Sequence, residues 1–194
     1  MTKIQREFSF AAGVHTDTFL MNQYMFTMYM IIGTDSFREQ QVAMDRIKFF
    51  LGELLDSAIL IKSSEKKSIE KYLACDFKVC TLPEQPYDQI VAIMLLLKLN
   101  AITEGRLIIT DITLESTTGD GVNFIHEVDD PLGPFEENGW WSDPGVGISD
   151  EKKQRKKKIV NLFKHAPTWN DFGLYWKEKE IKLIPAETEI QYPK

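Results

Sequence analysis

Residues 18–32 form a run rich in Met, Phe, Tyr and Ile that contains no charged residue. In an extended chain Met21 and Met25 fall on one face, whereas Tyr24, Phe26 and Met28 fall on the other. A run whose two alternating faces are both apolar is typical of a central strand that is covered on both sides. We therefore expect a layered protein with a sheet, and with this strand inside it.

Helical and extended patterns follow one another after Gly33. The expected elements are a helix opened by the capping box Ser36–Glu39, a strand at 58–61, a polar helix at 64–73, a strand at 76–82, a buried helix at 86–102, and a hairpin of strands at 106–115 and 122–128. This order predicts an α+β fold, a two-layer α/β sandwich with a ferredoxin-like βαββαβ core and an added β-hairpin strand. A different α/β sandwich is the alternative.

The length of 194 residues fits one domain with an extension. We divide it into an α/β sandwich core over 1–128, an aromatic and acidic loop over 129–150, and a C-terminal extension over 151–194 that packs on the core. The extension is expected to contain a helix near 150–164, an aromatic cluster around Trp169, and a strand near 180–184.

Cysteine content and hydropathy favour a cytoplasmic protein in a reducing compartment. Cys75 and Cys80 are expected to be buried thiols on or beside one strand, where the spacing disfavours a disulfide. The longest apolar run, 90–97, is far shorter than the ~20 residues that a membrane-spanning helix needs. We expect no targeting segment and no membrane partner.

Acidic residues of the predicted hairpin are one candidate site. Asp111, Glu115, His126 and Asp129 could hold Mg²⁺ or Mn²⁺ for the hydrolysis of a phosphoester, because carboxylates and imidazole are ligands of such ions. This alternative makes the protein a metal-dependent phosphoesterase or nuclease. The competing interpretation is a solvated hairpin face with His126 in the core, which needs no cofactor.

Lysines and one arginine make the run 152–158 strongly basic. The contributing residues are Lys152, Lys153, Arg155, Lys156, Lys157 and Lys158. They carry six positive charges in a chain of net charge −6, so the remainder carries −12. Such a body repels nucleic acid everywhere else, and the acidic residues of 127–137 offer a complementary surface. We expect contact with protein, or self-association; nucleic-acid binding is the weaker alternative.

Aromatic residues concentrate in the 129–150 loop at Phe135, Trp140 and Trp141. Large aromatic side chains anchor many protein interfaces. The standard nucleotide-binding, hydrolase and metalloprotease motifs do not occur in the sequence. The sequence therefore favours a non-enzymatic protein-binding or assembly module that uses this loop and the basic run. Trp169, Phe172, Tyr175 and Trp176 are expected to complete the core instead.

Overall fold

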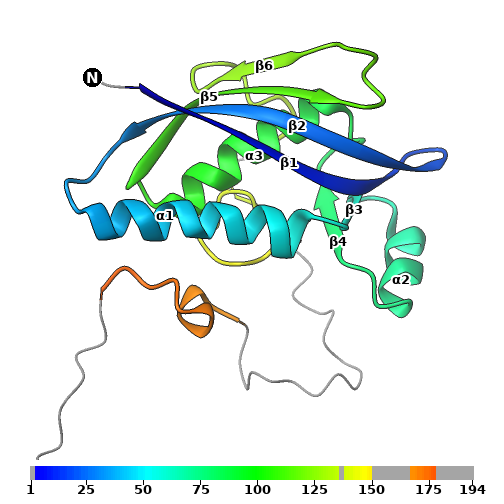
Figure 1. Cartoon of the computed structure of the whole chain (residues 1–194). Helices are drawn as coiled ribbons and strands as arrows, with labels where there is room; N and C mark the ends of the chain where they lie inside the picture. Colours follow the sequence, from blue (N-terminus) through cyan, green and yellow to red (C-terminus); the bar gives the residue numbers. More distant parts are fainter. Residues whose placement is uncertain (1–2, 136–137, 150–166, 178–194) are drawn as a thin grey trace, which may run out of the picture.

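A six-stranded mixed sheet with the strand order β4-β3-β1-β2-β5-β6 is the centre of the fold. The computed structural model describes residues 3–135, 138–149 and 167–177. The elements are β1 (Lys3–His15), β2 (Phe19–Ile32), α1 (Phe37–Phe49), the π-helical turn η1 (Phe50–Leu55), β3 (Ile59–Lys62), α2 (Lys66–Ala74), β4 (Val79–Leu82), α3 (Asp88–Thr103), β5 (Leu107–Ser116), β6 (Phe124–Glu127) and the 3₁₀ turn η2 (Trp169–Phe172). Figure 1 shows their arrangement.

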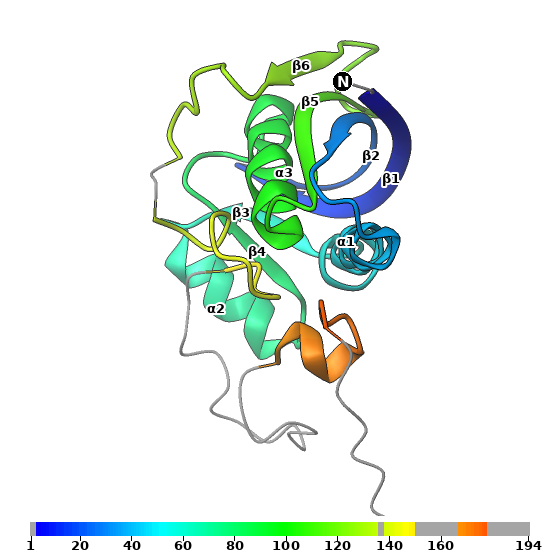
Figure 2. The same ribbon diagram turned by 90° about the vertical axis from the view of Figure 1, so that its left-hand side faces the viewer.

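Long antiparallel strands make up half of this sheet. β1 and β2 form a hairpin that stays in register from Lys3 opposite Ile31 to His15 opposite Phe19. β5 pairs with β2 on the other side, with one irregularity near Tyr29, and the short β6 completes this part. The strands curl strongly, so the sheet wraps partly around the helices (Figure 2).

Two short parallel strands, β3 and β4, extend the sheet sideways from the C-terminal end of β1. β3 pairs with β1 only over Gly13–His15, and β4 then pairs with β3. Helices connect these strands, as parallel pairing requires. Because β3 is short and lies at the C-terminal end of β1, the N-terminal half of β1 has no neighbouring strand on its outer side within the described residues.

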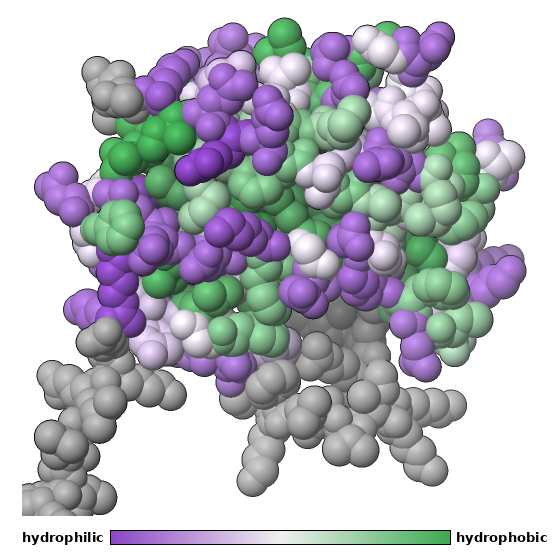
Figure 3. Space-filling view, viewed as in Figure 1, coloured by the Kyte–Doolittle hydropathy of each residue, from purple (hydrophilic) through white to green (hydrophobic). Residues whose placement is uncertain are grey.

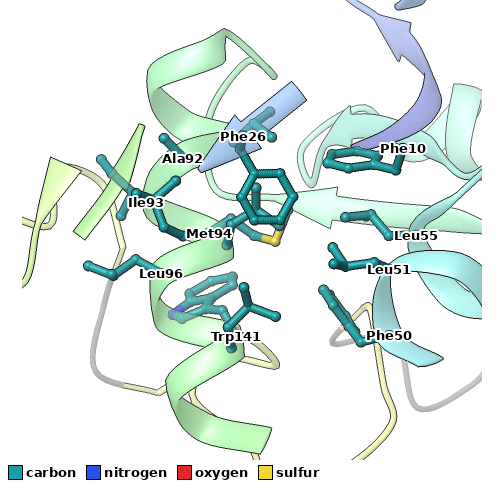
Figure 4. Packing of buried hydrophobic residues seen from close by; sticks show 14 of the residues in the cluster. Phe10, Phe26, Phe50, Leu51, Leu55, Ala92, Ile93, Met94, Leu96 and Trp141 are labelled. Carbon is teal, nitrogen blue, oxygen red and sulfur yellow. The ribbon is translucent and has the colours of Figure 1, made fainter. Parts of the chain in front are cut away.

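The core lies between the helices and the inner face of the sheet. Phe10, Phe26, Met28 and their neighbours pack from the sheet against α3 and against Leu51 and Leu55 of η1 (Figure 4). α3 is buried almost all around, as its uninterrupted apolar sequence predicts. Ile61 of β3, Ile69 of α2 and Val79 of β4 form a second small cluster.

The α+β class is confirmed, but the order of elements is not the expected βαββαβ. Residues 3–15 form a full strand before β2, so the first two described strands form a hairpin. The strand over 18–32 is central in the sheet, yet only its inner face is covered: Met28 is fully buried, whereas Met25 is 48% exposed. Cys75 follows α2 and is exposed; only Cys80 is buried, and both thiols are free.

Residues at several predicted boundaries behave as expected. Ser36 caps α1 and accepts a hydrogen bond from the backbone N–H of Glu39 at 3.3 Å, but the second half of the predicted capping box does not form, because the Glu39 carboxylate accepts from Thr34 and the backbone N–H of Ser36 donates to the Thr34 hydroxyl. Gly33 ends β2 at a point where a side chain would collide with the carbonyl oxygen of Gly105. None of the described helices is long and apolar enough to cross a membrane. The predicted helix at 150–164 and strand at 180–184 lie outside the described residues.

Candidate functional site

The residues of the predicted metal site do not converge. Asp111 lies opposite Glu127 in the β5–β6 ladder, whereas His126 lies opposite Ile112, so Asp111 and His126 point to opposite faces of the sheet. Asp111 instead pairs with Lys3, with 3.3 Å between Nζ and Oδ2. Across the described part of the chain, no group of three or more His, Cys, Asp or Glu side chains could hold a metal ion.

Buried surroundings distinguish His126 from the carboxylates. Its side chain faces the core, its Nδ1 lies 3.8 Å from the carboxylate of Asp130, and its Nε2 has no hydrogen-bond partner within the described residues. Burial lowers the pKa of His126, and the nearby Asp130 opposes this effect. His126 therefore matches the core histidine of the competing interpretation. Glu115 lies in β5 opposite Met25, and Asp129 is exposed after β6.

The aromatic residues of the 129–150 loop belong to the core. Phe135, Trp140 and Trp141 are each no more than 6% exposed. The indole N–H of Trp140 donates to the carbonyl of Thr81 at 2.7 Å, and its ring meets that of Trp141 edge to face. Figure 4 shows Trp141 beside Met94 and Leu96 of α3. In this structure these rings offer no surface to a partner.

The basic run 152–158 lies outside the described residues, as do Glu136 and Glu137. Of the acidic residues expected to complement it, Glu127, Asp129 and Asp130 are exposed. The second aromatic cluster packs as expected: Trp169 is buried, and Phe172 lies 4.4 Å from Phe49 between ring centroids.

The outer edge of β1 is an open strand edge. Ala11 and Gly13 direct their backbone groups away from β2: the N–H of Ala11 donates to Asp56 Oδ1 at 2.9 Å, and the N–H of Gly13 donates to the carbonyl of Ala58 at 2.8 Å. Residues two apart in a strand point the same way. Because the β1–β2 register has no shift, the same outward direction holds for Gln5, Glu7 and Ser9.

These outward backbone groups have no strand to pair with in the described chain, because β3 reaches only Gly13–His15. Figure 2 shows the N-terminal part of β1 at the outside of the curled sheet, with no element beyond it. The side chains of Lys3, Gln5, Glu7 and Ser9 are exposed, and Ile4 and Phe8 are half-buried against the core. We call residues 3–9 the β1 edge.

The outer face of the sheet, which adjoins the β1 edge, contains a shallow hollow. The hollow has a volume of about 540 Å³, and its lining residues come from β1, β2, β5 and the loop before β6: Glu7, Phe8, Ser9, Met25, Phe26, Thr27, Thr113, Glu115 and Asn123. Exposed apolar side chains lie on the same face of the sheet, among them Met21 of β2, which is 61% exposed, and Ile125 of β6, which is 65% exposed. Figure 3 shows such apolar side chains among polar ones over β1 and β2.

A polar network closes the far end of the β2–β5 ladder. Ser116 donates to Asp88 at the start of α3 with 2.6 Å between oxygens, and Asn22 accepts from Thr117 at 2.8 Å. Buried beside it, Tyr24 has its pKa raised, chiefly by desolvation. A raised tyrosine pKa disfavours the phenolate, so this network fixes a turn and offers no activated nucleophile.

Sequence reasoning missed the β1 edge although a signal exists. Phe8, Phe10, Ala12 and Val14 recur at every second position, and Gln5, Glu7 and Ser9 alternate with them. This is the pattern of a strand with one buried face.

No family model and no curated protein matches the chain. Among solved structures, the chain is similar to an uncharacterized protein, WS1659, from Wolinella succinogenes, with a TM-score of 0.48 and 12% sequence identity. The similar region covers 66% of this chain and 98% of that one.

Proposed function

We propose that the protein is a non-enzymatic assembly module, which binds a protein partner by adding a strand at the β1 edge. The observation that carries this proposal is the row of outward backbone groups at Gln5, Glu7 and Ser9, which no described strand pairs. An extended strand with unpaired N–H and C=O groups is a template for another strand, and many recognition domains bind their partners in this way.

The devices that usually prevent strand addition are scarce at this edge. The β1 edge contains no proline, and its register with β2 has no bulge. Edges of monomeric proteins are commonly short, bulged or covered, whereas residues 3–9 pair with β2 without a break and lie at the outside of the curled sheet (Figure 2). Three charged residues, Lys3, Arg6 and Glu7, are the remaining protection.

The outer face adds contact surface next to the edge. Glu7 and Ser9 belong both to the β1 edge and to the lining of the hollow, so a strand that pairs with β1 also brings side chains toward it. Exposed methionines such as Met21 and Met25 suit this role, because the flexible thioether adapts to varied shapes. The proposal thus keeps the class of function that the sequence favours and moves its contact surface from the aromatic loop to the sheet.

The metal-dependent alternative lacks comparable support, because Asp111 and His126 face opposite sides of the sheet. We therefore propose no hydrolase activity. Nucleic-acid binding depends on the run 152–158, which the described residues do not include.

Proline substitution at the β1 edge tests the proposal. Gln5→Pro removes one outward N–H and leaves the β1–β2 ladder intact, because proline is tolerated in an edge strand whose N–H faces outward. Gln5→Thr is the control, since threonine keeps the N–H and suits a strand. Native mass spectrometry of each protein, purified from its source, reports the subunits that it retains. We expect wild type and Gln5→Thr in a complex, and Gln5→Pro alone.

Circular dichroism of Gln5→Pro must match that of wild type for the comparison to hold. A Gln5→Pro protein that folds normally and keeps every partner would overturn the proposal. So would a wild-type protein that is monomeric at all concentrations and carries no partner from its source.

A further inference from the structure

We infer that the partner at the β1 edge is a second copy of this chain, joined by antiparallel β1–β1 pairing in which Lys3 of each copy faces Glu7 of the other. This inference rests on the proposed function and specifies its partner. It follows from the order of charges along residues 3–9, which is complementary to itself when the strand is reversed.

Few registers are open to such a pair. In an antiparallel ladder the residues whose N–H and C=O groups point outward must face one another, so Lys3, Gln5, Glu7 and Ser9 can pair only among themselves. A two-fold axis then passes through either a residue of this set or the residue between two of them. The side chains that meet across the axis decide which register is stable.

When the two-fold axis passes through Gln5, opposite charges face each other across the two strands. Lys3 then faces Glu7 of the other copy on the outer face, and by symmetry the same pair forms a second time. On the inner face, Ile4 faces the aliphatic stem of Arg6, a contact that buries apolar area beside the core. Opposite charges that face each other across a ladder stabilise it, and like charges destabilise it.

The neighbouring registers are less favourable. Centring on Arg6 places the two arginines directly opposite each other, and centring on Glu7 does the same for the two glutamates. When the axis passes through Ile4, Lys3 faces Gln5 of the other copy, and Glu7 faces a position before Lys3. Glu7 then has no lysine opposite it. The register with the axis at Gln5 therefore pairs the outward backbone groups and also places opposite charges opposite each other. It forms three hydrogen-bonded pairs and about six backbone hydrogen bonds.

The same charges can also be explained as protection of an edge against aggregation. Protective charges repel a second copy in whichever register it approaches. Here one register places Lys3 of each copy opposite Glu7 of the other. The Lys3 side chain is 59% exposed and can reach a partner, although it also contacts Asp111. Because the two-fold axis is perpendicular to the sheet, the helical layers of both copies lie on the same side of the combined sheet.

Charge exchange tests the pairing. We expect Lys3→Glu and Glu7→Lys each to weaken the dimer about tenfold in sedimentation velocity, because each places two like-charged pairs across the axis. The double variant, with both charges exchanged, restores opposite pairs and should return to within about threefold of wild type. Lys71→Glu, an exposed site on α2, makes the same change in net charge as Lys3→Glu and should have no effect.

The contact between Lys3 and Asp111 does not confuse this comparison. It is lost equally in Lys3→Glu and in the double variant, so the difference between these two proteins isolates the pair with Glu7. A double variant no tighter than Lys3→Glu would overturn the register.

A cross-link provides a second measurement. Gln5→Cys places two thiols across the axis with Cα atoms about 5.5 Å apart, within the range of a disulfide. The exposed Cys75 is replaced by Ser in this background. We expect mild oxidation to give a covalent dimer, and Ser9→Cys, which lies beyond the pairing, to give none.

Equal cross-linking at both positions would contradict the inference. A wild-type chain that stays monomeric at every concentration would also overturn it. If that chain nevertheless retained a different protein from its source, and lost it on Gln5→Pro, the proposed function would stand without this partner.

Discussion

Lys98 shows how one residue can organise a long loop. It lies in an apolar helix and is fully buried, and its ammonium donates to the carbonyls of Trp140, Asp143 and Gly145 at 2.9, 2.8 and 2.8 Å. These three bonds use all the donors of the ammonium. Lys98 thereby fixes the loop residues 138–149 against α3 and holds Trp140 and Trp141 in the core.

Replacing Lys98 by Met should destabilise the fold by about 3 kcal/mol, because the substitution keeps most of the volume but leaves three carbonyls without their buried donor. Urea denaturation followed by circular dichroism measures the change. Lys71→Met removes a solvent-exposed ammonium and should stay within about 0.5 kcal/mol of wild type. A Lys98→Met protein as stable as this control would show that the loop is held by its aromatic side chains alone.

Arg46 of α1 is one of the residues that hold the segment 167–177. The buried guanidinium donates to the carbonyls of Leu174 and Ile102 at 3.0 and 3.1 Å and to Glu104 at 2.8 Å. It also stacks on the ring of Trp176, with 3.7 Å to the centroid. Burial lowers the pKa of Arg46, and Glu104 opposes this effect. One side chain therefore joins α1, the end of α3 and a distant segment.

Removing this guanidinium should release the segment. Arg46→Met keeps the apolar stem and loses the polar contacts, so we expect opening of 167–177 to become easier by about 2 kcal/mol. Chymotrypsin cleavage within the segment, which follows the open population, should then rise about 30-fold. Lys48→Met, which removes an exposed pair with Asp45, is the matched control. Unchanged cleavage in Arg46→Met would assign the docking to Trp169 and Phe172.

Individual elements were more predictable from the sequence than their pairing. Local patterns found β2, the four strands after it and the three helices, because apolar runs, alternation and helix-capping residues within each segment are enough to indicate it. They did not find β1, whose polar N-terminal half hides the alternation that begins at Phe8. They also placed Trp140 on the surface, because burial of this loop depends on Lys98, which is distant in sequence and is not marked by any local pattern.

At the scale of the whole molecule, the sheet has one covered and one uncovered face. The burial of β2 alternates strictly around Met25 and Met28, although both faces are apolar in sequence. The helices cover only one side of the curled sheet (Figure 2), and Met21 and Met25 on the other side are 61% and 48% exposed. A sheet of this kind can gain stability by burying its free face or its edge, and this gain is the physical basis of the proposed assembly.

Matched substitutions on the two faces test this asymmetry directly. Met28 is fully buried and Met25 is 48% exposed, although they are three residues apart in one strand and have the same side chain. Met28→Lys should cost more than about 4 kcal/mol or abolish folding, because it buries an unpaired charge in the core. Met25→Lys should change the free energy of unfolding of the isolated chain by less than about 0.5 kcal/mol. Urea denaturation at low protein concentration measures both without interference from association. A large loss at Met25 would mean that the outer face is covered within the chain itself, and this would leave the β1 edge as the surface available to a partner.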